Sequence, residues 1–74
     1  MEEPVLDRID GPKLRAFRLT RGLSQREIAI RAGLANETVN KIERFGGPKG
    51  VQTRTLYKLA GALEIPPDEL LAGS

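Results

Sequence analysis

The chain has 74 residues, a net charge of +2, and neither cysteine nor histidine. This length fits one domain with a small core, which must rely on regular helix packing or a partner subunit because disulfides are impossible. The absence of Cys and His excludes zinc fingers, thiolate nucleophiles and imidazole acid–base chemistry. No apolar run approaches the roughly 18 residues of a membrane span, and the acidic start argues against a secretory signal. The composition therefore predicts a soluble, mostly helical, intracellular domain.

The charges are segregated along the chain. Residues 11–63 carry eleven Lys or Arg against three Glu, whereas residues 1–10 and residues 64–74 each carry a net charge of −3. A basic middle segment is typical of a protein that binds a polyanion such as nucleic acid. The alternative is a solvated helical surface whose charges cluster without a partner.

The first residues predict an arm followed by a helix. Residues 1–10 show only weak alternation of apolar residues, so we expect an extended N-terminal arm or short turn that packs lightly on the domain. The first helix should begin near Pro12, because proline fits the first turn and Asp10 or Gly11 can cap it. Gly22 is well placed to end this helix.

The sharpest local signal marks the start of a second helix. Ser24 followed three residues later by Glu27 is a capping box. Leu23 before it and Ile28 after it can form a hydrophobic staple. This helix should end at Gly33 after about eight residues. Its expected inner face consists of Ile28, Ala29 and Ala32, whereas Ile30 lies off that stripe and should be exposed.

Three further helices complete an all-α bundle of five. The third should run from Asn36 to Phe45 and be followed by a flexible basic loop at residues 46–50. Thr53 can cap the fourth helix, which residues 65–67 (Ile-Pro-Pro) break, and the last helix should run from Asp68 to Ala72. The apolar stripes are Val39 and Ile42; then Leu56, Leu59, Ala60 and Leu63; and finally Leu70 and Leu71.

Two short helices joined by a Gly-containing turn form a helix-turn-helix. The ordered residues from Leu14 to Arg44, with Gly-Leu-Ser-Gln-Arg-Glu-Ile-Ala at 22–29, resemble the Cro/C1-type (XRE-like) family of phage and bacterial transcriptional repressors. Residues 55–63 and 69–71 resemble that family's fourth and fifth helices. The resemblance spans residues 11–72 and implies a five-helix, lambda-repressor-like DNA-binding domain whose third helix enters the major groove.

The outward face of the third helix is where this family reads base edges. Asparagine suits adenine, lysine suits guanine, and glutamate can accept a hydrogen bond from cytosine. The alternative is an ordinary polar helix face. Ala35 stands where the family often has a capping Ser or Thr, so Asn36 is a candidate cap, which would withdraw it from base reading. The candidate base-reading residues are Asn36, Glu37, Asn40 and Lys41.

The resemblance also implies structural and phosphate-binding roles. Arg18 and Glu43 resemble the family's ion pair between the first and third helices, although Arg18 as a phosphate contact is the alternative. Gln25, at the start of the second helix, resembles the family's phosphate-contacting glutamine, where backbone N–H groups also favour an anion. The other candidate phosphate contacts are Arg15, Arg21, Arg26, Thr38, Arg44, Lys49 and Arg54.

The implied function is sequence-specific binding of double-stranded DNA by a transcriptional regulator, most simply a repressor. Because one helix reads only a few base pairs, we expect a homodimer on a pseudo-palindromic operator. Such a protein would be bacterial or phage-encoded and act in the cytoplasm without a cofactor or metal. A separate dimerisation or effector domain, if there is one, is expected beyond Ser74. The expected dimer surface consists of Leu63, Ile65, Leu70 and Leu71, for which a place in the core is the alternative.

Two other classes of function compete with DNA binding. Members of this family also serve as antitoxins or adaptors whose main partner is a toxin or another protein, and Ile30 or the acidic termini would suit that role. An enzyme is disfavoured because the chain lacks His, Cys and a phosphate-cradling glycine loop after a strand. Its central carboxylates are also committed, Glu27 to capping and Glu43 to Arg18.

Overall fold

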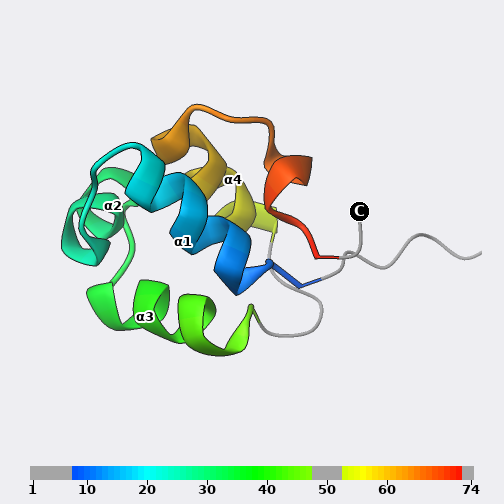
Figure 1. Cartoon of the computed structure of the whole chain (residues 1–74), viewed down its shortest axis with the longest axis horizontal. Helices are drawn as coiled ribbons and strands as arrows, with labels where there is room; N and C mark the ends of the chain where they lie inside the picture. The colour runs from blue at the N-terminus through cyan, green and yellow to red at the C-terminus, as the bar shows by residue number, and fades with distance from the viewer. Residues whose placement is uncertain (1–7, 48–52, 73–74) are drawn as a thin grey trace, which may run out of the picture.

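The computed structural model describes residues 8–47 and 53–72, which form an all-α domain. In chain order its elements are α1 (Gly11–Thr20), α2 (Gln25–Ala32), α3 (Asn36–Phe45), α4 (Thr53–Leu63) and the short 3₁₀ helix η1 (Pro67–Leu70). Figure 1 shows α1 across the middle of the molecule, α2 at one end and α3 along one edge. The predicted fold class is therefore confirmed. Within the described ranges, no helix is both long enough and apolar enough to cross a membrane.

Local capping chemistry sets the start of α1. The Asp10 carboxylate accepts a hydrogen bond from the backbone N–H of Lys13 at 3.0 Å, which satisfies one of the free donors of the first turn. Pro12 lies in that turn, where its missing N–H costs nothing. Asp10 is thus the cap, as one of the two sequence alternatives proposed. Thr53, the expected cap of α4, is instead the first described helical residue of α4.

The predicted last helix is wrong in type and extent. Residues Pro67–Leu70 form a single 3₁₀ turn rather than an α-helix over 68–72. The chain leaves this turn because its backbone pairs with residues that precede α1. Leu71 forms an antiparallel bridge with Ile9, and the Ala72 N–H donates to the Arg8 carbonyl at 2.9 Å. A long-range partner therefore ends the helix.

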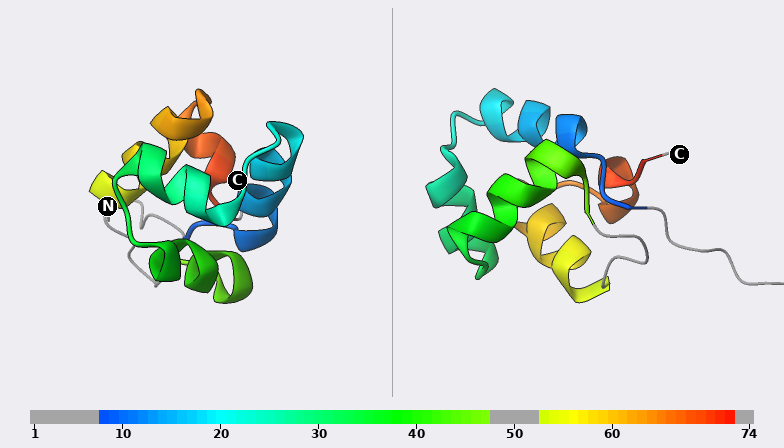
Figure 2. Two further views of the ribbon diagram at one scale, coloured as in Figure 1. Left: turned by 90° about the vertical axis from the view of Figure 1, so that its left-hand side faces the viewer. Right: turned by 90° about the horizontal axis from the view of Figure 1, so that it is seen from below.

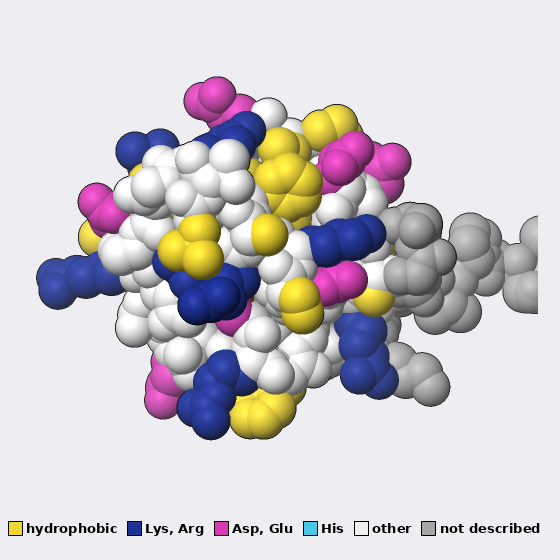
Figure 3. Space-filling model, in the orientation of Figure 1, with side chains coloured by type: hydrophobic (Ala, Val, Ile, Leu, Met, Phe, Trp, Pro, Cys, Tyr) yellow, Lys and Arg dark blue, Asp and Glu magenta, His cyan; other side chains and the backbone are white. Residues whose placement is uncertain are grey.

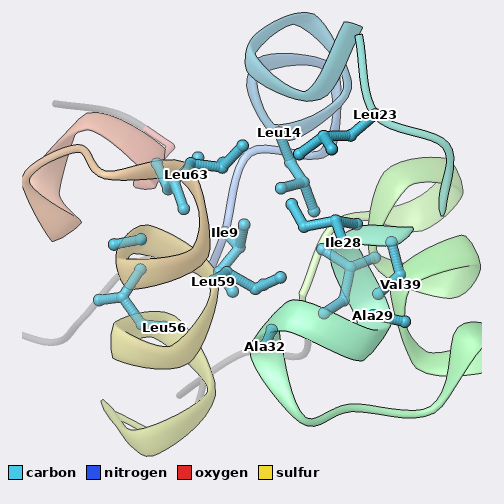
Figure 4. Packing of buried hydrophobic residues seen from close by; sticks show 13 residues of the cluster. Ile9, Leu14, Leu23, Ile28, Ala29, Ala32, Val39, Leu56, Leu59 and Leu63 are labelled. Atoms are coloured by element: carbon cyan, nitrogen blue, oxygen red, sulfur yellow. The ribbon is translucent and has the colours of Figure 1, made fainter. Parts of the chain in front are cut away.

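The core lies where all four α-helices meet, and Figure 4 shows its side chains pointing toward one another. Every predicted stripe residue on α2, α3 and α4 is buried. Ile9, assigned from the sequence to an arm that packs only lightly, is completely buried as well, whereas residues 1–7 of that arm lie outside the described residues. The buried apolar residues are Ile9, Leu14, Leu23, Ile28, Ala29, Ala32, Val39, Ile42, Leu56, Leu59, Ala60, Leu63 and Leu70.

Burial corrects half of the expected dimer surface. Leu63 and Leu70 have an exposed fraction of 0% within a single chain, so their side chains belong to the core, the alternative that the sequence left open. Ile65 and Leu71 are only partly buried against that core. The sequence could not separate these pairs because all four share the same apolar character.

Gly11 allows α1 to approach α3 closely. A Cβ at this position would lie 2.5 Å from the Ile42 carbonyl oxygen and 2.6 Å from that of Glu43. Both atoms belong to helical backbone, which cannot move aside without disturbing α3. Gly61 offers a contrast, because it lies in α4, is exposed, and has no atom within 4 Å of its would-be Cβ.

We expect Gly11→Ala to lower the free energy of unfolding by about 1–3 kcal/mol, the usual cost of overpacking. Gly61→Ala is the matched control, and it should raise the free energy of unfolding by about 0.5–1 kcal/mol because alanine favours helix. Urea denaturation of the three proteins measures both effects. Equal stability of Gly11→Ala and the wild type would contradict the close approach.

Candidate nucleic-acid interface

The start of α2 is held by the predicted capping box. The Ser24 hydroxyl accepts from the Glu27 N–H at 3.0 Å, and the Glu27 carboxylate accepts from the Ser24 N–H at 2.7 Å. Two hydrogen bonds to Ser24 lower the pKa of Glu27. The bond to the Ser24 backbone has the larger effect, and the bond to the Ser24 side chain has the smaller one. Leu23 and Ile28 on either side are both buried, in keeping with the expected staple. Two backbone donors are thus satisfied at this helix end.

Gly33 makes the turn between α2 and α3. Its φ of 71° is left-handed, a conformation that glycine adopts without steric cost. The next residue, Leu34, donates its N–H to the Ala29 carbonyl at 2.8 Å, which closes the helix end. Ala29 and Ala32 are small and buried, so α3 can pack closely after the turn. The predicted end of α2 is confirmed.

The outward side of α3 is uncovered by the other described helices. Figure 1 shows α3 along the lower edge, and in the view from below in Figure 2 it lies in front of its neighbours. Its inner face carries Val39, Ile42 and Glu43, all buried. Ala35 occupies the cap position without a side-chain hydrogen bond. Asn36 is therefore an exposed first helical residue, and the suggestion that it caps α3 is wrong.

The candidate base-reading residues gather on this uncovered side. Asn36, Glu37 and Lys41 are exposed, and Asn40 is half-buried at the edge facing α2. Positions four apart lie above one another on a helix, so Asn36 with Asn40 and Glu37 with Lys41 form two adjacent rows. That these residues contact bases is a proposal.

Arg18 and Glu43 form a buried ion pair between α1 and α3. The Arg18 Nε lies 2.6 Å from Glu43 Oε2, and its second guanidinium nitrogen donates to Oε1 at 3.0 Å. The Arg18 side chain is 9% exposed and that of Glu43 3%. A third donor of Arg18 reaches the Leu23 carbonyl at 2.8 Å. The hydrogen bond to Glu43 raises the pKa of Arg18 further above its already high ordinary value.

Gln25 connects this ion pair to the outward side of α3. Its Nε2 donates to Glu43 Oε1 at 3.0 Å, and its Oε1 accepts from Asn40 Nδ2 at 3.2 Å. The sequence interpretation placed Gln25 at a phosphate and did not connect it to Asn40 or Glu43. Nothing in the sequence links residues 15 and 18 positions apart unless the helix packing is already known.

The candidate phosphate contacts come from four different helices and the segments beside them. On the face shown in Figure 3, Lys and Arg side chains lie in several separate places rather than in one patch. The Arg44 guanidinium lies 5.4 Å from the centre of the Phe45 ring, a cation–π contact that leaves both residues exposed. Lys49 falls outside the described residues. Among the other candidates, Arg15, Arg21, Arg26, Arg44 and Arg54 are exposed, and Thr38 is half-buried.

A short helix, a left-handed glycine turn and a second helix with an open outer face define a helix-turn-helix protein. A helix-turn-helix family model matches residues 14–70, and the chain belongs to that family. The resemblance to its Cro/C1-type (XRE-like) members, drawn from the sequence, is thereby confirmed.

Known proteins agree with this placement. The HTH-type transcriptional regulator RghRB of Bacillus subtilis is 35% identical over 66 residues, which cover 86% of this chain and 45% of the relative. The restriction-modification controller protein C.AhdI of Aeromonas hydrophila shares the fold at a TM-score of 0.70 and 38% identity, over 82% of this chain and 89% of its own. A chain of the SinR–SinI protein complex matches at a TM-score of 0.69 and 28% identity, over 85% of this chain and 60% of its own length. The chain thus spans about half the length of the curated relative.

We expect Glu43→Gln to lower the free energy of unfolding by about 3–5 kcal/mol, because it leaves the Arg18 charge buried without its counter-ion. Glu37→Gln is the matched control on the exposed side of the same helix and should change stability by less than about 0.5 kcal/mol. Thermal and urea unfolding followed by circular dichroism measure both. If the two variants lost similar amounts of unfolding free energy, the buried ion pair would contribute no more to stability than an exposed charge does.

The lowered pKa of Glu27 predicts a pH-dependent contribution to stability. A carboxylate with a folded pKa below its unfolded value stabilises the protein above the unfolded value, about 4.3 for glutamate, and loses this effect as pH falls through the folded pKa. The stability advantage of the wild type over Glu27→Gln should therefore be full at pH 7 and vanish in acid. Urea denaturation from pH 7 to pH 2 tests this. An advantage that stays constant over the whole range would contradict it.

Proposed function

We propose that this protein binds double-stranded DNA at specific sequences as the DNA-binding part of a transcriptional regulator. The uncovered, polar outer side of α3 is the observation that carries the proposal. A B-DNA major groove is about 12 Å wide and admits one α-helix. The membership of the helix-turn-helix family and the likeness to one transcriptional regulator and one controller protein support the same function.

The proposed docking places α3 in the groove and the start of α2 at the DNA backbone. There the free N–H groups of the first turn of α2 and the exposed Arg26 would meet a phosphate. Gln25 retains one Nε2 hydrogen beyond its bond to Glu43, so it can donate to the same phosphate. The exposed Arg44 and Lys41 add positive charge along α3. Phosphate contacts position the protein, and α3 reads the bases.

We further propose that two copies bind a pseudo-palindromic operator and repress transcription by occupying it. Half-sites centred ~34 Å apart would place both α3 helices on one side of the duplex. Of the dimer surface expected from the sequence, Ile65 and Leu71 retain exposed area. A bacterial or phage operator would also place the protein's action in the cytoplasm.

A protein partner is the second candidate function. Ile30 on α2 is 69% exposed and is one of four large apolar residues that are exposed in the described part of the chain. The solved SinR–SinI complex pairs a chain of similar fold with another protein. An antitoxin or adaptor would use such an exposed apolar residue. Mobility shifts on random DNA fragments at low salt separate the two functions, because absence of any shift would favour the protein partner.

Lys41→Ala should weaken binding to the preferred site by about 1–3 kcal/mol and affect non-specific DNA much less, because a base contact is lost. Arg26→Ala is the comparison variant and should weaken all sequences alike, because a phosphate contact carries no sequence information. The preferred site comes from selection with a random DNA pool, and Kd values are then measured by mobility shift at several salt concentrations. The wild-type log K should fall linearly with log salt.

If Lys41→Ala bound the selected site and random DNA in the same ratio as the wild type, the assignment of the reading face would be wrong. An affinity independent of salt would argue against a DNA phosphate backbone as the partner.

A further inference from the structure

Asn40, Gln25 and Glu43 form a chain of side-chain hydrogen bonds in which Asn40 donates to Gln25 and Gln25 donates to Glu43. The Glu43 carboxylate has only acceptor oxygens, and Arg18 donates to both of them. A neighbour that bonds to this carboxylate must therefore present a donor. The amide of Gln25 carries a donor and an acceptor of nearly equal size, and the carboxylate selects between them.

The orientation of the Gln25 amide determines the orientation of the Asn40 amide. Because Gln25 turns its NH₂ group to Glu43 at 3.0 Å, its carbonyl oxygen is left facing Asn40. That oxygen requires a donor, and the Asn40 NH₂ group supplies it at 3.2 Å. The reverse orientation of Asn40 would set two amide oxygens against each other. Asn40 Oδ1 therefore points away from Gln25, and it accepts no hydrogen bond within residues 8–47 and 53–72.

We propose that Gln25 is a positioning residue that holds the Asn40 amide oxygen toward the DNA, so that Asn40 selects a base with an amino group in the major groove. Only adenine, through N6, and cytosine, through N4, offer a donor there, whereas guanine and thymine offer acceptors. This inference rests on the proposed DNA binding and adds a base class and the residue that enforces it. The second hydrogen on Asn40 Nδ2 also lets adenine N7 accept, as in a bidentate contact.

Without Gln25, the preference of Asn40 would be lost. A free asparagine amide can turn over and present its NH₂ group to guanine O6 or thymine O4 instead. The carboxylate and the guanidinium behind Gln25 prevent this turn. The side chain is thus oriented before DNA arrives, and less rotamer entropy is lost at that position on binding than for a free asparagine.

The test is selection from a random DNA pool, followed by Kd measurements on the selected site with each of the four bases at every position. Three variants are compared with the wild type: Asn40→Ala, Gln25→Met and Arg26→Met. Methionine keeps the length of Gln25 but makes no such hydrogen bonds, and Arg26→Met is the matched control on the same helical turn. Circular dichroism establishes that each variant is folded.

The wild type should prefer adenine or cytosine over guanine or thymine by about tenfold or more at one position per half-site. Asn40→Ala should remove this preference at that position alone. Gln25→Met should reduce it to about threefold or less, whatever it does to overall affinity. Arg26→Met should keep the full preference even where it weakens binding.

Two results would overturn the inference while leaving DNA binding intact: no position that depends on Asn40, or a Gln25→Met variant with the wild-type preference. Absence of binding to any DNA would instead overturn the proposed function, and this inference with it. The outcomes are therefore distinguishable.

A second measurement needs no DNA. In NMR spectra of the free protein, the side-chain amide protons of Asn40 should exchange with solvent about tenfold more slowly than those of Asn36, because hydrogen bonding protects them. Asn36 is the matched control, because it is exposed on the same helix. Gln25→Met should bring the two rates together. Equal rates in the wild type would contradict the hydrogen-bonded chain from Glu43 to Asn40.

Discussion

The buried pair of Arg18 and Glu43 fixes how α3 sits on the rest of the domain. Apolar side chains in a small core tolerate some sliding, because hydrophobic contact has no preferred direction. A guanidinium that donates twice to one carboxylate is directional and loses both bonds when the helices shift. Arg18 also reaches the Leu23 carbonyl just before α2. One side chain therefore ties together α1, the turn before α2, and α3.

Small residues make room for this arrangement. Gly11 lets the first turn of α1 lie against the α3 backbone, and Ala29 and Ala32 keep the inner face of α2 thin. Because α1 and α2 both lie close to α3, Val39 and Ile42 fill the space at its inner face. The polar residues of α3 are then left on the outside, where a groove of nucleic acid can receive them. Close packing on one side of α3 thus produces the open surface on the other.

Local rules predicted most of the helices, because their ends depend on neighbours in sequence. The capping box at Ser24 and Glu27 is complete within four residues, and it marked the start of α2 correctly. The failures involve partners that are distant in sequence. Ile9 is buried and η1 ends early because Ile9 pairs with Leu71, more than 60 residues away. In addition, the apolar pattern alone cannot distinguish Leu63, which lies in the core, from Ile65, which is partly exposed. The Gln25–Asn40 bond was missed for the same reason.

In the proposed interface, the exposed charges and the groups with a fixed direction have different roles. Exposed arginines lie on α1, α2, α3 and α4, and on the face shown in Figure 3 the basic side chains lie in several separate places, so their attraction for a polyanion does not by itself choose an orientation. Orientation must come from groups with fixed direction. The start of α2 is one, and the amide of Asn40 is another, because the buried carboxylate sets which end of the Gln25 amide faces Asn40, and this end in turn sets which end of the Asn40 amide faces away from Gln25. Net charge would thus bring DNA to the protein, whereas the ion pair beneath α3 would decide what α3 reads.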